Sequence, residues 1–95
     1  MNINNLQKDI SSWADGIIPN RTAKQAMIKL VMEEIPELLK NPTNADEFAD
    51  VAILVLDIAN LQGINLEEAI SKKMELNKKR EWKVDKETGI MSHVE

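Results

Sequence analysis

The pattern of hydrophobic and polar residues along the chain predicts four amphipathic helices. Apolar side chains recur at the spacing that places them on one side of an α-helix. The expected helices cover residues 3–14, 22–40, 44–62 and 65–81, separated by turn signals at Asp15-Gly16, Asn41-Pro42 and Gly63, and the polar tail 83–95 has no assigned element. No segment alternates apolar and polar positions for more than a few residues, as a half-buried strand would. The chain is therefore expected to form one all-α domain over residues 1–95, a four-helix bundle with short connections.

Capping and helix-breaking residues refine these boundaries. Thr22 and Gln25 have the spacing of a capping box at the start of the second helix, and Asn44 and Asn65 are expected to cap the next two. Pro36 lies inside the second helix, where it has no N–H to donate to the carbonyl oxygen four residues earlier. We therefore expect a kink or a local bulge in this helix.

Two acidic pairs lie within the apolar stripes of the second and third helices. Glu34 and Glu37 share one stripe, and Glu47 and Asp50 share the other. Each pair is spaced i, i+3, so its carboxylates are neighbours on one helical turn, and the short connection makes the two helices antiparallel neighbours. Four carboxylates that face a bundle interior need a counter-charge, because desolvation penalises their ionised forms. A divalent cation would supply it.

The nature of the ligands narrows the choice of metal. A set of carboxylate oxygens favours Mg²⁺, with Mn²⁺ as an alternative, over zinc or iron. The single histidine, His93, lies in the unassigned tail, and the Glu-x-x-His motif of ferritin-like di-iron proteins is absent. The competing interpretation is that these acids sit at the edge of the stripe as solvated surface charges, as most exposed acidic pairs on helices do.

The fourth helix carries groups of the opposite charge. Lys73, Asn77 and Arg80 continue its apolar face, and six of the 12 basic residues fall within residues 72–83. A site with a metal end and a cationic end suits a phosphate chain, because metal ions bridge phosphate oxygens and Lys or Arg neutralises the rest. Alternatively, the long basic side chains lay their stems on apolar surface and reach water at the helix end.

Composition excludes several classes of protein. With 95 residues and 43% hydrophobic content, the chain has room for one core. Twelve basic and 16 acidic residues give a net charge of −4, which argues against binding a nucleic acid polymer or an anionic membrane by bulk attraction. The absence of cysteine suits a cytoplasmic protein, and no apolar run is long enough to cross a membrane. Because a small chain buries little of its surface, self-association is expected.

The acidic motifs resemble the signature of the MazG-like, all-α nucleoside triphosphate pyrophosphohydrolases. Residues 33–37 and 47–50 have the EExxE and ExxD spacing. The phage and bacterial dATP/dGTP diphosphohydrolase branch is further resembled at Pro19-x-Arg21-Thr22, Asp50-Val51-Ala52-Ile53-Leu54 with Leu56-Asp57, Gly63, Lys73-(x3)-Asn77-(x2)-Arg80-x-Trp82 and His93-Val94. The resemblance covers residues 11–94, and the nine-residue spacer between Glu37 and Glu47 favours this compact branch.

The resemblance implies an activity and an assembly. Members hydrolyse a nucleoside triphosphate between the α and β phosphates, here a (d)NTP, of the purine type dGTP or dATP, to (d)NMP and pyrophosphate, with Mg²⁺. They assemble as a homodimer or as a dimer of dimers, a homotetramer. Carried over by motif position, the metal ligands would be Glu34, Glu37, Glu47 and Asp50, the catalytic carboxylates Glu33 and Glu37, and the substrate-binding residues Lys73, Asn77, Arg80 and Arg21.

Three further residues have two interpretations each. Trp13 and Trp82 could stack on a base, although an aromatic residue at helical spacing is more often part of the core. Asp57 lies one heptad after Asp50, so it could support the metal ligands or accept a hydrogen bond at an interface. For the whole chain, the alternatives to an enzyme are a catalytically silent helical protein that forms oligomers and a nucleotide-binding regulator on the same fold.

Overall fold

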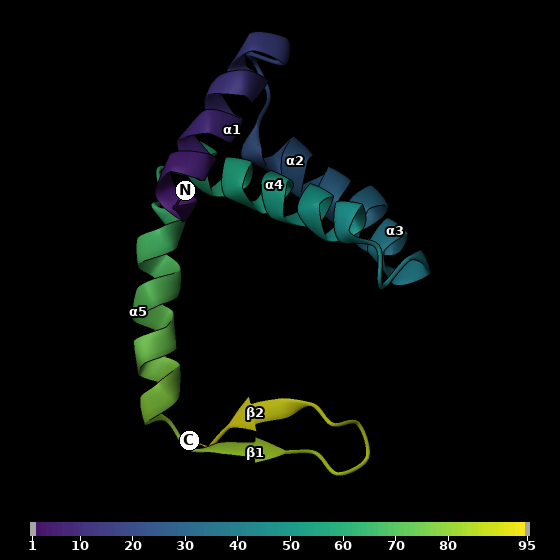
Figure 1. Cartoon of the computed structure of the whole chain (residues 1–95), viewed down its shortest axis with the longest axis vertical. Coiled ribbons are helices and arrows are strands. Elements are labelled where there is room, and N and C mark those ends of the chain that lie inside the picture. The colour runs from purple at the N-terminus through teal and green to yellow at the C-terminus, as the bar shows by residue number, and fades with distance from the viewer. Residues whose placement is uncertain (1, 95) are drawn as a thin grey trace.

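The computed structural model describes residues 2–94 and is mostly helical (Figure 1). Its elements are α1 (Ile3–Ile17), α2 (Ala23–Lys29), the π-helical turn η1 (Leu30–Glu34), α3 (Ile35–Lys40), α4 (Ala45–Leu61), α5 (Leu66–Lys79), β1 (Trp82–Val84) and β2 (Met91–His93). The four expected helices are present, with α2, η1 and α3 forming the second. The expectation of an all-α chain is wrong at the C-terminus, where the tail forms two strands.

These strands pair as an antiparallel hairpin. Trp82 lies opposite His93, and their rings meet edge to face with centroids 5.8 Å apart. In the turn, the Asp85 carboxylate accepts hydrogen bonds from the backbone N–H groups of Glu87 and Thr88, and Gly89 adopts a positive φ of 73°. Strands of three residues are too short to produce a recognisable alternation of apolar and polar positions.

The second helix contains the bulge predicted from Pro36. The N–H of Ile35 donates to the carbonyl oxygen of Leu30, five residues earlier, which is the hydrogen bond of a π-helix. Pro36 follows at the start of α3, where its missing N–H is tolerated. At the other end, the Thr22 and Gln25 side chains form the predicted capping box. The bulge falls on Glu33 and Glu34, the first residues of the acidic motif.

Helix α1 packs across the corner between α4 and α5. The Gln7 side chain is 2% exposed, donates to the carbonyl oxygens of Leu56 and Ile64, and accepts from the N–H of Leu66. One amide thereby satisfies backbone groups at the end of α4 and the start of α5, groups that would otherwise be left unpaired. The predicted end of α1 at Asp15-Gly16 is wrong, since the helix continues to Ile17.

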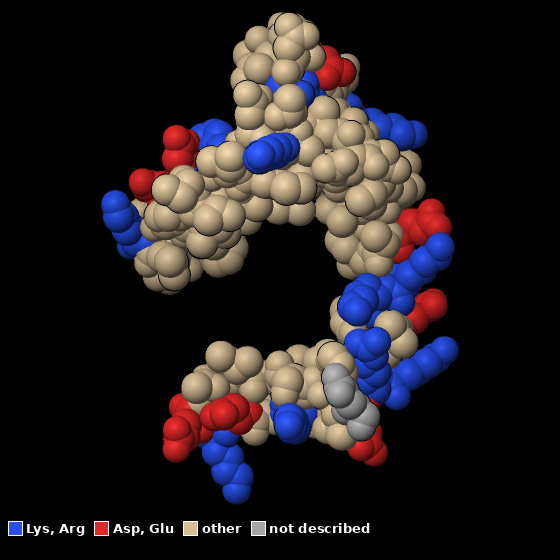
Figure 2. Space-filling model, turned by 180° about the vertical axis from the view of Figure 1, so that it is seen from behind, with Lys and Arg blue, Asp and Glu red and all other residues tan. Residues whose placement is uncertain are grey.

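The helices do not close into a bundle within one chain. Helix α5 bends away from α4 by 103° and packs only on α1 and α4 among the described elements, so the chain has the open C shape of Figure 1. The radius of gyration is 15.8 Å, whereas a compact domain of this size has about 13 Å. Figure 2 shows that Lys and Arg gather along α5 and that the surfaces facing the opening are mostly uncharged.

Among the described residues, no single helix has the length and hydropathy needed to cross a membrane. Helices α4 and α5 reach the required length and hydropathy only when they are counted together, and they are bent by 103° relative to each other.

Candidate active site

Three of the four predicted metal ligands converge between two helices. Glu34 ends the π-helical turn, while Glu47 and Asp50 lie one turn apart near the start of α4. A carboxylate oxygen from each of the three lies within 4.8 Å of those of the others. Helix α4 packs against η1 and α3, as expected for antiparallel neighbours joined by a short connection. This spacing lets all three oxygens contact one ion.

The electrostatics of the cluster favour a bound cation. Partial burial raises the pKa of the Glu47 carboxyl, and the negative charges of Glu37, Asp50 and Glu34 raise it further. Glu47 is half-buried, so water compensates its charge only in part. A bound divalent ion would remove this penalty and would favour the ionised form of every carboxylate in the cluster.

The remaining two acids of the motif lie at the edge of the cluster. Glu37 is not one of the three residues that converge, but it is close enough for its charge to raise the pKa of Glu47. Glu33 is exposed and forms an ion pair with Lys29, with Nζ 2.6 Å from Oε2. Both are therefore placed where they can act on a ligand of the cluster without being central to it.

Lys29 is a site residue that the sequence analysis missed. Its ammonium group lies 2.6 Å from Glu33 and 3.0 Å from Glu34, and these two carboxylates raise its pKa. The i, i+4 spacing from Glu33 was the available signal, but such pairs are common on exposed helices. In this structure Lys29 supplies positive charge directly at the acidic cluster.

Arg21, predicted to bind substrate, is engaged in a buried ion pair. Its Nε and Nη2 donate to the two oxygens of Asp57, both over 2.7 Å, and its Nη1 donates to Asp15 over 2.8 Å. The Arg21 and Asp57 side chains are only 9% and 7% exposed. Ser11 also donates to Asp57 and accepts from Asn60. Arg21 thus joins α1, α4 and the loop before α2, which favours a positioning role over contact with phosphate.

The basic residues of α5 lie apart from the acidic cluster in one chain. Glu47 and Asp50 are near the start of α4, whereas α5 begins beyond its opposite end and turns away (Figure 1). Lys73 is exposed, and Arg80 caps the C-terminus of α5. Asn77 has a buried side-chain oxygen that accepts no hydrogen bond within the described residues. These groups do not form a single site with the carboxylates of their own chain.

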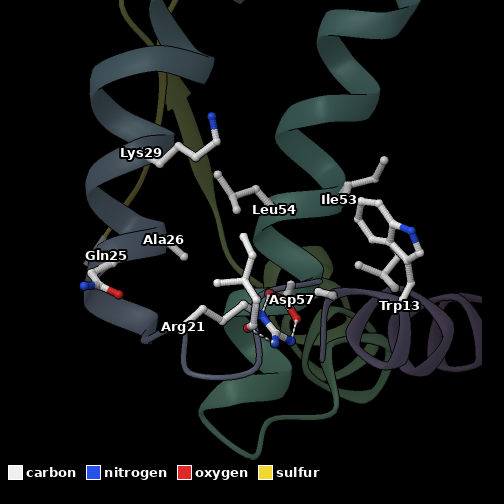
Figure 3. A pocket seen from close by; sticks show the side chains of 11 residues that line it. Trp13, Arg21, Gln25, Ala26, Lys29, Ile53, Leu54 and Asp57 are labelled. Carbon is white, nitrogen blue, oxygen red and sulfur yellow. Dashed lines mark hydrogen bonds and ion pairs between the residues drawn. The ribbon is translucent and has the colours of Figure 1, made fainter. Parts of the chain in front are cut away.

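Of the two interpretations of Trp13, packing in the core of its own chain does not apply. The residue is 65% exposed and lines a cavity with residues of α2 and α4 (Figure 3). The buried face of α1 is formed by Gln7, Ile10 and Ser11 instead. The helix itself was predicted correctly, but its buried face was not. Gln7 and Ser11 of α1 point toward α4, because they donate hydrogen bonds to the carbonyl oxygen of Leu56 and the carboxylate of Asp57.

Together, the fold and the cluster define a MazG-like helical protein with carboxylates arranged for divalent metal ions. The chain matches, at a TM-score of 0.87, the solved structure titled "Cyanophage S-2L MazG-like pyrophosphohydrolase bound to dGDP and three catalytic Mn2+ ions per active site". The two share 36% identity, and the match covers 100% of this chain and 99% of that one.

Sequence comparisons identify the family. The chain is 46% identical over 93 residues to a dATP/dGTP diphosphohydrolase of Salmonella phage PMBT28, covering 97% of this chain but 31% of that protein, so it spans about a third of that relative's length. It is 38% identical over 91 residues to a dATP/dGTP diphosphohydrolase of Cyanophage S-2L, covering 94% of this chain and 85% of that protein. The model of the dATP/dGTP pyrophosphohydrolase family matches residues 6–95. The chain belongs to this family.

Proposed function

We propose that this protein is a Mg²⁺-dependent pyrophosphohydrolase that converts dATP and dGTP to the monophosphates and pyrophosphate. The observation that carries the proposal is the convergence of Glu34, Glu47 and Asp50 within 4.8 Å in a chain of this family. Mn²⁺ can replace Mg²⁺, because both accept a ligand set made only of oxygen atoms. The solved relative holds Mn²⁺ and dGDP.

The carboxylates of the cluster would hold the metal, with Glu37 completing the set. The raised pKa of Glu47 supports this role, since the crowding of negative charge that causes it is what a divalent ion relieves. When bound, the metal lowers the pKa of a coordinated water and polarises the phosphoryl oxygens.

Glu33 is our candidate for the group that accepts the proton of the attacking water, and Glu37 is the second. The water oxygen attacks the α-phosphorus in line, the bond to the bridging α–β oxygen breaks, and pyrophosphate leaves with the electron pair. Glu33 is exposed and held at the edge of the cluster by Lys29. The same lysine lies where it can neutralise charge that develops on the phosphates.

Lys73, Asn77 and Arg80 bind the phosphates from a neighbouring copy of the chain. Helix α5 leaves α4 at the end opposite the acids and bends away by 103°, so these groups lie apart from the cluster of their own protomer. Asn77 would donate to a phosphate oxygen through its Nδ2, because its Oδ1 can only accept and is buried within its own chain.

Exposed apolar side chains support a homodimer or a dimer of dimers. Large hydrophobic residues lie uncovered along η1, α3 and α4: Val31, Met32, Ile35, Leu39, Phe48 and Val55. Met32 is 70% and Leu39 75% exposed. Contiguous apolar surface of this kind mostly marks an interface in a small protein. We propose a reducing cytoplasm as the location of this assembly, which a sequence without cysteine suits.

The test is a panel of all (d)NTPs with the purified protein and Mg²⁺, with monophosphate and pyrophosphate both measured. We expect equal amounts of the two products from dATP and dGTP, and none in EDTA. Glu34→Gln should abolish turnover with the helical circular dichroism unchanged, whereas Glu87→Gln, an exposed residue in the hairpin turn, should behave as wild type. Binding of a nucleotide without products would favour the regulator, and neither binding nor products would favour the silent oligomer.

A further inference from the structure

A hollow lies between α1, α2 and α4 (Figure 3). It has a volume of about 360 Å³. Its walls are mainly apolar, with Ile10 and Trp13 from α1, Ala26 from α2, and Ile53 and Leu54 from α4. The indole of Trp13 is two-thirds exposed, so an aromatic face is open to a ligand rather than packed in the core.

Two charged residues that line this cavity, Arg21 and Asp57, are already paired with each other. Both oxygens of Asp57 accept from Arg21, and the remaining donors of that guanidinium are used by Asp15, Ser11 and a backbone carbonyl. A ligand beside Arg21 and Asp57 therefore meets the face of Trp13 and aliphatic side chains, because neither the guanidinium nor the carboxylate is left unpaired. This environment suits a planar heterocycle, which gains from stacking and apolar contact.

Lys29 connects the wall of this cavity to the acidic cluster. Lys29 lines the cavity, and its Nζ contacts Glu33 and Glu34. On α4, Ile53 follows Asp50 by one turn, and Asp57 follows it by two, which is about 10 Å along the axis. The sugar and base of a nucleotide can span this distance when its phosphates lie at the carboxylates.

We propose that this cavity is the base-binding site and that Trp13 stacks on the purine. The inference rests on the proposed function for the position of the phosphates. Recognition by stacking and size, with Arg21 and Asp57 paired to each other, accepts adenine and guanine alike. Pyrimidines, which offer a smaller face to the indole, are bound less tightly.

The kinetic test compares Trp13→Leu with Ile17→Ala, a change to an exposed apolar residue one turn further along α1 that does not line the cavity. Trp13→Leu should raise KM for dATP and dGTP by about tenfold, the size expected for loss of base stacking, with kcat within about twofold of wild type. KM for dCTP and dTTP should rise by less, because their bases offer a smaller face to the indole, so the preference for purines should shrink. Ile17→Ala should change neither constant.

A binding test separates this inference from the proposed activity. Since the chain has two tryptophans, Trp82→Phe leaves Trp13 as the only indole. Deoxyguanosine monophosphate should quench its fluorescence, and deoxyribose 5-phosphate should not. Quenching without turnover would support the base site while refuting the proposed function.

Three results would overturn the base site itself. One is no quenching by the nucleotide. Another is a kinetic result in which the wild-type protein is active but Trp13→Leu either leaves KM unchanged or raises KM equally for purine and pyrimidine nucleotides. The third is loss of a wild-type oligomer in Trp13→Leu by analytical ultracentrifugation, because a second copy of the chain would then be what covers the cavity.

Discussion

At the scale of single residues, the most buried ion pair among the described residues is that of Arg21 with Asp57. Two short hydrogen bonds join side chains that are both nearly buried, and Ser11 and Asp15 complete the network. Removing one partner leaves an uncompensated charge in a poorly solvated place, which costs about 3 kcal/mol. The pair fixes the position of α1 on α4 and thereby supports the cavity wall that α1 provides.

The pairing predicts a pH dependence of stability. The hydrogen bonds and charge of Arg21 lower the pKa of Asp57 from its ordinary 3.8. The carboxylate therefore stabilises the fold fully above pH 3.8 and loses this contribution as the pH falls through the lowered pKa. Asp57→Asn should reduce the free energy of unfolding in urea by about 3 kcal/mol at neutral pH, and the difference from wild type should shrink in acid. Exposed Asp9→Asn is the control, and a difference that does not vary with pH would contradict this prediction.

The carboxylate ligands make a second prediction at this scale. Asp50→Asn keeps the size of the side chain but removes its charge, so metal affinity and kcat should fall by at least a hundredfold while the urea midpoint is unchanged or higher. A higher midpoint is expected because the substitution relieves repulsion with Glu47. Full activity in this variant would remove Asp50 from the site.

Local interactions at single residues could be predicted from the sequence, whereas distant ones could not. The capping box of Thr22 and Gln25 was predictable because its partners are three residues apart. The pairing of Arg21 with Asp57 joins residues 36 apart in the chain and depends on the fold of α1 and α4. The acidic cluster was predictable because each carboxylate pair shares a helix turn and one short connection aligns the two helices.

At the scale of elements, the π-helical turn is the feature that places the acidic motif. Pro36 predicts it, because the helix must adjust where an N–H is missing, and Glu34 lies at the last position of the turn. The hairpin was not predictable from periodicity, since each strand has three residues and most of their side chains are exposed. Strong, long patterns were interpreted correctly, and short elements held by backbone pairing were missed.

Two glycines near helix C-termini differ in backbone conformation, and substituting each by alanine tests this difference. Gly63 follows α4 with a φ of +72°, and a β-carbon there would meet no atom within 4 Å, so Gly63→Ala should cost about 1 kcal/mol through backbone strain alone. Gly16 lies inside α1 with similar open space, so Gly16→Ala should stabilise by about 0.5–1 kcal/mol. Thermal unfolding of both variants checks the pair, and shifts of the same sign would contradict the assigned conformations.

At the scale of the whole molecule, the open C shape separates the acidic cluster from the basic face of α5. Sequence patterns identified both faces, but the direction in which α5 leaves α4 depends on packing at a single corner around Gln7. The four helices were predicted correctly, but the turn of α5 away from α4, which leaves the bundle open within one chain, was not predicted. The extended shape and the exposed apolar residues of η1, α3 and α4 are the reasons to treat the active unit as an assembly.

A shared site predicts complementation between two defective variants. Glu34→Gln lacks a metal ligand, and Lys73→Ala lacks a phosphate-binding cation. If α5 acts on the partner's cluster, a mixed dimer has one site in which the intact cluster of one chain meets the intact α5 of the other. Random mixing makes about half of the dimers mixed, and each has one intact site of two, so about a quarter of wild-type activity returns at low substrate concentration. Each variant alone, refolded in the same way, is the control. Activity no higher than the average of the two separate variants would show that Lys73 does not act across the interface.

The central claim is that carboxylates of two helices hold a divalent ion, and Mn²⁺ binding followed by electron paramagnetic resonance tests it most directly. The signal of free Mn²⁺ should fall as wild-type protein is added. The double variant Glu34→Gln with Asp50→Asn should bind at least tenfold more weakly, and Glu87→Gln should match wild type. Equal Mn²⁺ affinity in the double variant and the wild-type protein would contradict the account, because the ion would then be held elsewhere.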